Sequence, residues 1–169
     1  YACAVLGLVP TLAGAPALAL ADGSWWRMVD YLPDTRTHDT ADDPALAREA
    51  GRAFGAFARA LADVPTRDIG EVIPRFHDPH SRYAAFRDAL AVDRAGRANA
   101  CRAECAAANA YAGVVEEWTR LEAEGLPTRI VHNDCKLNNL LFDAAGRAVC
   151  VIDLDTVMPG SPLFDFGDL

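Results

Sequence analysis

The chain is poor in basic residues and contains a single lysine. It carries 16 Lys and Arg against 24 Asp and Glu, for a net charge of −8. Proteins that bind nucleic acid through its phosphates present a basic surface, so this composition argues against nucleic-acid binding. Phosphate would have to be bound locally, by a metal ion or by one well-placed cation such as Lys136.

Charged residues are missing entirely from Tyr1 to Ala21. The run Ala17–Ala21 before Asp22 imitates a signal-peptide cleavage site, but a signal peptide needs a basic leader and none precedes it. A membrane-spanning helix is also disfavoured, because the segment is interrupted by Gly7, Pro10, Gly14 and Pro16. We therefore predict buried strands and turns here, and no membrane contact.

A disulfide framework is not indicated either, since the cysteines are odd in number. They are Cys3, Cys101, Cys105, Cys135 and Cys150. Cys101 and Cys105 share a helical face. Together with His77 and His80 they would give four candidate zinc ligands. Neither pair has the usual ligand spacing, and Pro79 separates the histidines. Buried, reduced thiols are the favoured interpretation, which predicts a reducing, cytoplasmic location.

Helical signals dominate the middle of the chain. The segment from Gly23 to Pro33 predicts a turn, a strand and a break. Asp43 as N-cap and Pro44 as first residue then predict a helix, whose apolar face carries Leu46, Ala50, Phe54, Phe57 and Leu61 and which Pro65 closes. From Ser81 onward we expect two helices separated near Gly96, the second with one face formed by Tyr111, Val114, Val115, Trp118 and Leu121.

After Pro127 the pattern changes to short strands. Arg129–Val131 is one, and residues 140–142 and 148–152 are two more, joined by the turn Asp143–Gly146. A strand, then mostly helices, then a small β-hairpin make an α+β fold.

The polar run His132–Asn139, followed by the hairpin and Asp153, contains the candidate site. Folding the hairpin brings the start of its first strand beside the end of its second, so Asn139 and Asp153 project from neighbouring positions. A carboxylate and an amide carbonyl are hard oxygen ligands suited to Mg²⁺. Asp134 lies in the loop just before, able to face a substrate hydroxyl, and Lys136 supplies a cation for a transferring phosphoryl group.

The spacing H-x-D-x-x-x-x-N, then a hydrophobic strand ending in Asp, resembles the catalytic loop of protein-kinase-like phosphotransferases. The run HNDCKLNNLLFD…VCVIDLDTVMPGSPLFDFGD is similar to the aminoglycoside phosphotransferase and choline kinase family, and most to its N-acetylhexosamine 1-kinase-like members. Upstream, Trp26–Leu32 resembles the last N-lobe strand and the hinge, and Ile73–Asp78 resembles a segment of the same subgroup. The fold implied is a mostly helical C-lobe with a small catalytic hairpin, preceded by the last strands of an N-lobe.

The resemblance implies a role for each polar residue. Asp134 would be the catalytic base or orient the acceptor hydroxyl, Asn139 and Asp153 would bind Mg²⁺, and the backbone near Asp30 and Leu32 would receive the adenine of ATP. His132 would brace the loop. The acceptor would be a small polar metabolite, favoured to be an amino sugar phosphorylated at its anomeric hydroxyl.

Two aspartates near Asp153 need separate interpretations. Asp165-Phe166-Gly167 spells the protein-kinase metal motif but lies twelve residues beyond the hairpin, so we assign the metal to Asp153 and expect Asp165 to brace the loop by hydrogen bonds. For Asp155, a second metal ion, a water and a structural role all remain open.

The upstream part of the kinase pattern is missing. Neither a glycine-rich loop nor a strand lysine is found before the hinge, and the first 22 residues contain no Lys or Arg. The chain of 169 residues also begins at Tyr1 rather than Met and ends directly after a motif. We therefore expect residues 1–32 to be the remnant of an N-lobe and hinge, and residues 33–169 to be an incomplete C-lobe. The alternative is that the chain is a degenerate relative of these kinases. In either case we expect little kinase activity from the chain by itself. Its oligomeric state is left open.

Three other interpretations compete. A phosphohydrolase of the haloacid dehalogenase type would use Asp153 as nucleophile and Asp155 as general acid/base, but it needs a downstream lysine and leaves the spacing of Asp134 and Asn139 unexplained. A noncatalytic pseudokinase-like binding module would fit the missing nucleotide lobe. A plain helical domain with an acidic loop is the third interpretation, but under it the spacing of Asp134, Asn139 and Asp153 would be a coincidence.

Overall fold

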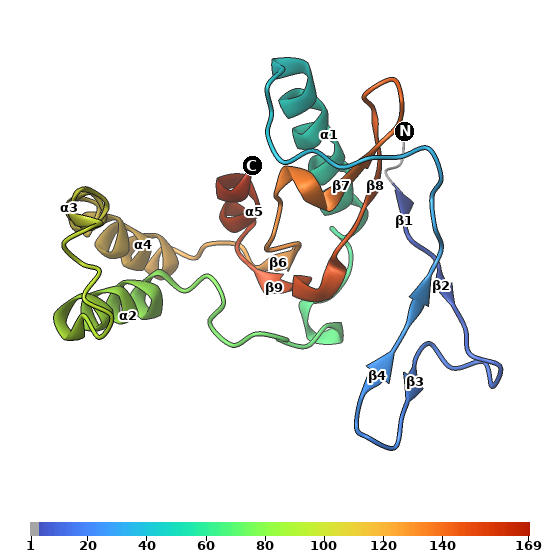
Figure 1. Ribbon diagram of the computed structural model, residues 1–169, viewed down its shortest axis with the longest axis horizontal. Helices are drawn as coiled ribbons and strands as arrows, with labels where there is room; N and C mark the ends of the chain where they lie inside the picture. Colours follow the sequence, from blue (N-terminus) through green and yellow to red (C-terminus); the bar gives the residue numbers. More distant parts are fainter. Residues whose placement is uncertain (1–3) are drawn as a thin grey trace. The chain divides into compact units, whose positions relative to one another are not determined.

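A computed structural model describes residues 4–169 and divides the chain into two compact units (Figure 1). One unit contains residues 71–128, and the other contains residues up to 70 together with 129–169. Helices and small sheets coexist, as expected for an α+β fold. Among the described residues, no helix is both long and apolar enough to cross a bilayer.

The unit of residues 71–128 consists of three helices, α2 (Pro79–Val92), α3 (Arg102–Ala110) and α4 (Gly113–Ala123). Asp78 caps α2 by accepting a hydrogen bond from the His80 amide, and Gly96 takes a positive φ of 64° in the turn that follows. The break near Gly96 is confirmed. The prediction of one helix after it was wrong, because the chain turns at Tyr111 and Ala112, where Tyr111 is exposed and burial does not hold the predicted apolar face together.

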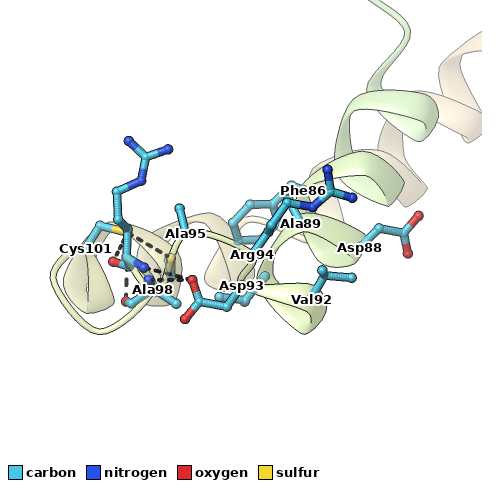
Figure 2. A pocket seen from close by; sticks show the side chains of 12 residues that line it. Phe86, Asp88, Ala89, Val92, Asp93, Arg94, Ala95, Ala98 and Cys101 are labelled. Atoms are coloured by element: carbon cyan, nitrogen blue, oxygen red, sulfur yellow. Dashed lines mark hydrogen bonds between the residues drawn. The ribbon is translucent and has the colours of Figure 1, made fainter.

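A cavity of about 610 Å³ lies where α2 leads into α3 (Figure 2). Its lining is mostly apolar and includes Phe86, Ala89, Val92 and Ala98, with Cys101 and Cys105 at one side. None of the residues in these three helices is fully buried. This unit therefore holds together through partly exposed contacts.

The core of the other unit lies between α1 (Pro44–Ala60) and the hairpin of β7 (Leu140–Phe142) and β8 (Ala148–Val151). The expected Asp43 cap is confirmed, since its carboxylate accepts a hydrogen bond from the Ala45 amide. The predicted apolar face of the helix is buried at Ala50, Phe54 and Phe57, whereas Leu46 and Leu61 are only partly buried. The buried residues and Ala53 pack against Leu140, Phe142, Ala148 and Val151.

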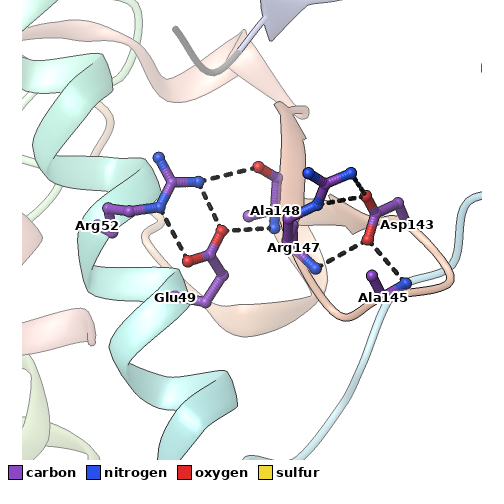
Figure 3. Close-up of polar contacts among 6 residues, drawn as sticks. All are labelled: Glu49, Arg52, Asp143, Ala145, Arg147 and Ala148. Atoms are coloured by element: carbon purple, nitrogen blue, oxygen red, sulfur yellow. Dashed lines mark hydrogen bonds and ion pairs between the residues drawn. The ribbon is translucent and has the colours of Figure 1, made fainter. Parts of the chain in front are cut away.

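Polar contacts tie the hairpin to α1 and close its turn (Figure 3). Glu49 accepts a hydrogen bond from the Ala148 amide at 3.0 Å and forms an ion pair with Arg52 at 2.6 Å. In the turn, Asp143 accepts hydrogen bonds from the amides of Ala145 and Arg147. Glu49 thereby fixes the start of β8 on the helix, and the opposite end of β8 leads into Asp153.

Two elements after the hairpin were not predicted. β9 (Met158–Gly160) pairs antiparallel with β6 (Arg129–Val131), and the short helix α5 (Pro162–Asp168) follows, with Ser161 as its N-cap. A close fit joins the two strands, since a Cβ on Gly160 would lie 2.7 Å from Val131 Cγ2. This pairing brings the end of the chain beside the loop that starts at His132.

The apolar beginning of the chain forms strands, as expected, but they are not buried. β1 (Ala4–Val5) adds to β8 in parallel, while β2 (Leu8–Val9) pairs with β5 (Met28–Val29), and β3 (Leu18–Ala19) with β4 (Trp25–Trp26). The prediction of burial was wrong, because two-stranded ladders provide no second layer to cover their side chains. Leu8 is 53% and Leu18 is 50% exposed. Cys3 and the first residues lie outside the described part.

Candidate active site

His132 anchors the loop that follows β6 in the core. Its side chain is fully buried, and its ring meets the rings of Phe54 and Phe57 edge-on, with centroids 5.4 and 5.5 Å away. Its Nε2 lies 3.1 Å from the carbonyl oxygen of Ile152, just after β8. A ring enclosed in this way contacts two elements of the core and has no face open to a substrate.

The next residues turn outward and form a polar cluster around Asp134. Asp134 Oδ2 accepts hydrogen bonds from Lys136 Nζ at 2.6 Å and from Asn139 Nδ2 at 2.8 Å. Burial alone raises the pKa of Asp134, but these two hydrogen bonds outweigh it and bring the pKa below its ordinary value. Asp134 is therefore an ionised carboxylate at neutral pH.

The hairpin brings Asn139 and the end of β8 together, as the spacing predicted. The Ile152 amide donates to the Asn139 carbonyl at 2.9 Å, and Asp153 follows directly with a left-handed backbone, φ 58° and ψ 60°. Among residues 4–169 no hydrogen bond ends on the Asp153 carboxylate, which is exposed. The pKa of Lys136 is raised, first by its hydrogen bond to Asp134 and further by the charges of Asp153 and Asp168, so these groups share one electrostatic environment.

The oxygen atoms near the hairpin fit a hard cation. The Asn139 amide nitrogen is used up by Asp134, to which it donates at both the carboxylate and the backbone carbonyl, so the amide oxygen is the atom left for a ligand. Within the described residues, no three His, Cys, Asp or Glu side chains gather as a metal cluster. Mg²⁺ does not require such a cluster, because it takes one or two protein oxygens and completes its shell with water and phosphate.

Asp165 lies against the backbone of the loop. Its carboxylate accepts hydrogen bonds from the amides of His132 at 2.9 Å and Asn133 at 2.7 Å. Asn133 itself has a left-handed backbone, φ 63°, a conformation that asparagine adopts more readily than most other non-glycine residues. The two hydrogen bonds favour this turn, which points the following Asp134 away from the core.

Residues that sequence reasoning missed also hold the loop. Thr156 Oγ1 donates to the His132 carbonyl at 2.7 Å, and its own carbonyl accepts from Asn133 Nδ2 at 3.0 Å. Asp168 accepts from the Cys135 amide at 3.2 Å. These contacts span more than twenty residues of sequence, so no local pattern indicates them.

The remaining predicted residues make contacts outside this cluster. Asp155 forms an ion pair with Arg27, between β4 and β5. The Asp30 amide donates to the Gly7 carbonyl in the ladder of β2 and β5, and the Leu32 carbonyl accepts from Thr35 Oγ1. The Asp30 N–H is therefore already engaged, which leaves carbonyl oxygens and the Leu32 amide as the groups to test for contact with a nucleotide.

Comparison with known families agrees with the catalytic-loop resemblance. The family model described as "Phosphotransferase enzyme family" (APH) matches residues 4–169. The chain belongs to the phosphotransferase enzyme family. The match extends over the loop, the hairpin and α5. Membership in the phosphotransferase enzyme family implies a kinase-like fold and a phosphotransferase activity. The match gives no support to the phosphohydrolase or pseudokinase interpretations.

The cysteines only partly follow their prediction. Cys135 and Cys150 are fully buried, and burial raises the pKa of the Cys135 thiol well above its ordinary range. Cys101 and Cys105 are half-buried instead, because they border the cavity beside α3. The two histidines of the zinc set that the spacing disfavoured make other contacts, since His80 Nε2 lies 3.1 Å from Thr119 Oγ1 and the His77 ring packs on Phe76.

Proposed function

We propose that the chain contains the catalytic loop of an ATP- and Mg²⁺-dependent kinase that phosphorylates a hydroxyl of a small polar metabolite. The observation that carries this proposal is the cluster of Asp134, Lys136 and Asn139 beside the open carboxylate of Asp153. The favoured acceptor is a sugar or amino sugar phosphorylated at its anomeric hydroxyl. This choice rests on the resemblance to N-acetylhexosamine 1-kinases.

Asp134 has one oxygen available for the acceptor. Both of its side-chain hydrogen bonds end on Oδ2, and within the described part of the chain none ends on Oδ1. We assign Oδ1 the task of accepting a hydrogen bond from the acceptor hydroxyl. Because the carboxylate has a low pKa, it would orient that hydroxyl first and take its proton only when the new bond to phosphorus is largely formed.

Lys136 and the side-chain oxygens at the hairpin would stabilise the negative charge of the phosphate groups. Lys136 is half-exposed and its ammonium group is held next to Asp134, where it would contact the transferred phosphoryl group. Asn139 and Asp153 would hold Mg²⁺, which would neutralise the phosphates when bound. The backbone near Asp30 and Leu32 would receive the adenine. As the chain has no second lysine, we expect weak turnover from it alone.

The metal assignment is tested by calorimetric titration with a nonhydrolysable ATP analogue, with and without Mg²⁺. Binding should require Mg²⁺ and should be lost in Asp153→Ala. Asp155→Ala is the matched control, since it removes the neighbouring carboxylate, which the phosphohydrolase mechanism would need and which in the structure forms an ion pair with Arg27. Asp165→Ala is a poor control, because Asp165 accepts two backbone hydrogen bonds from the loop. Binding that is independent of Mg²⁺, or unchanged in Asp153→Ala, would contradict the assignment.

The acceptor class is tested separately, by incubating the protein with labelled ATP and a panel of free and N-acetylated hexosamines. A phosphate on the anomeric carbon is labile to mild acid, whereas one on a primary hydroxyl is not. Acid-labile product formed from N-acetylated hexosamines would support the favoured acceptor. Stable product, or transfer to compounds without an anomeric hydroxyl, would contradict it and leave the kinase assignment in place.

A further inference from the structure

Two thiols face each other in the unit of residues 71–128. Cys101 is the N-cap of α3 and Cys105 lies one turn further on, a spacing that places both side chains on one face. Their Sγ atoms are 3.8 Å apart, and both residues are half-buried. The pair has no part in the phosphotransferase chemistry proposed above.

The pair borders the cavity between α2 and α3. The cavity of about 610 Å³ has an apolar lining with Arg94, Arg97 and Asp93 among its charged residues. Cys101 and Cys105 therefore meet an open volume large enough for an ion and its water ligands. The buried Cys135 and Cys150 have no such access.

We propose that Cys101 and Cys105 form a two-thiolate site for a soft, thiophilic divalent cation of the zinc and cadmium class. A tetrahedral ion with metal–sulfur bonds of about 2.3 Å needs its sulfur atoms about 3.8 Å apart, which is the distance found between the two Sγ atoms. The separation of the two sulfur atoms thus needs little change, and the Cys101 thiol gives up its hydrogen bonds to the Arg97 and Ala98 carbonyls when the metal binds. Each thiol loses its proton to solvent as its metal–sulfur bond forms, and water fills the remaining positions from the cavity.

The chemistry of this pair selects a different cation from the hairpin. Thiolates prefer soft ions, whereas the oxygens of Asn139 and Asp153 suit Mg²⁺. With only two protein ligands, and no third His, Cys, Asp or Glu side chain gathered beside them in residues 4–169, the ion would exchange readily. The pair therefore predicts reversible binding rather than a permanent structural metal.

The helical spacing of the two cysteines also disfavours a disulfide between Cys101 and Cys105. Side chains four apart on a helix have Cβ atoms about 5–6 Å apart, whereas a disulfide needs about 3.5–4.5 Å. Closing the bond would distort the first turn of α3, while binding a bridging cation would not. The geometry favours the cation.

The experiment titrates cadmium ions alone into the fully reduced chain, in a Cys3→Ser background with a phosphine reductant. Thiolate ligation gives an ultraviolet charge-transfer band, which should reach saturation at one equivalent. Cys101→Ser and Cys105→Ser should each weaken binding by at least about tenfold, since even loss of an outer contact to a metal ligand costs roughly 10–100-fold. Circular dichroism would verify that the helices persist in each variant.

A relocated thiol is the matched control. Cys105→Ala combined with Ala106→Cys keeps the number of thiols but turns one of them away from Cys101, and it should bind cadmium no better than Cys105→Ser. Binding that is unchanged in Cys105→Ser or in the relocated variant would overturn the proposal. The proposal would also be overturned if Cys101 and Cys105 were recovered as a disulfide from protein that had not been treated with reductant. Such a bond would link two tryptic peptides that cleavage after Arg102 otherwise separates.

Discussion

Replacing Asp165 by Asn would remove the charged acceptor that holds the turn at the start of the catalytic loop. In the structure, one carboxylate oxygen accepts from the His132 amide and the other from the Asn133 amide. An asparagine has a single acceptor oxygen, so its NH₂ group would face one of these N–H donors. At least one hydrogen bond is lost, and the other loses its ionic character.

The expected cost follows from these two bonds. A hydrogen bond to a charged group contributes about 1.5–3 kcal/mol, and a neutral one about 0.5–1.5 kcal/mol. Losing one charged bond and weakening the second gives a decrease of about 2–4 kcal/mol in the free energy of unfolding. The left-handed backbone of Asn133 adds to the effect, because the same bonds stabilise it.

Urea denaturation at neutral pH, followed by tryptophan fluorescence and circular dichroism, measures the change. Asp155→Asn is the control, since it removes an equal charge from an exposed ion pair with Arg27 and should cost at most about 1 kcal/mol. Hydrogen exchange should also become faster at the amides of His132 and Asn133. A loss no larger than that of the control, with unchanged exchange at both amides, would refute the role given to Asp165.

Four further predictions concern single positions. A hydrogen bond from Arg52 lowers the pKa of Glu49 in the folded state. The stabilising contribution of Glu49 is therefore complete above the unfolded-state pKa of about 4.3 and is lost as pH falls through the lower folded-state value. The difference in urea midpoint between the unaltered chain and Glu49→Gln should shrink between about pH 6 and pH 3. Asp43→Ala removes the cap of α1 and should cost about 0.5–2 kcal/mol of unfolding free energy, measured in urea. Gly160→Ala places a Cβ 2.7 Å from a valine methyl of β6 and should cost about 1–3 kcal/mol in the same assay. Asp134→Asn should lower the rate of phosphoryl transfer by about 10²–10⁴-fold; turnover within a few-fold of the unaltered protein would contradict the role of Asp134.

Local signals account for the parts of the fold that were predictable. Asp43 and Pro44 mark the start of α1, and the helical spacing from Leu46 to Leu61 identifies the face that is buried. The turn at Asp143–Gly146 closes a hairpin in which the Asp143 side chain caps the backbone of the turn itself. Each signal acts within a few residues, so it can be recognised without knowledge of the rest of the chain.

Nonlocal contacts account for the parts that were not predictable. β9 contains Pro159 and Gly160, residues that are rare in strands, and it forms a strand only because β6 lies beside it. The exposure of Leu8 and Trp25 could not be inferred either, because their apolar character is the same whether or not another layer covers them. The ion pair of Arg27 with Asp155 joins residues 128 positions apart, beyond the range of any local pattern.

The candidate site combines both kinds of information, and this predicts how its residues should differ in experiments. Spacing alone placed Asn139 and Asp153 together, because a tight hairpin leaves its two ends no other arrangement. The orientation of Asp134 depends on tertiary contacts instead, since the buried His132 ring and the Asp165 carboxylate hold the backbone before it. Substitutions at His132 or Asp165 should therefore lower stability and activity together. Asp153→Asn should affect metal-dependent nucleotide binding while leaving the unfolding free energy nearly unchanged, because the carboxylate accepts no hydrogen bond from residues 4–169 and asparagine also tolerates the left-handed backbone at this position.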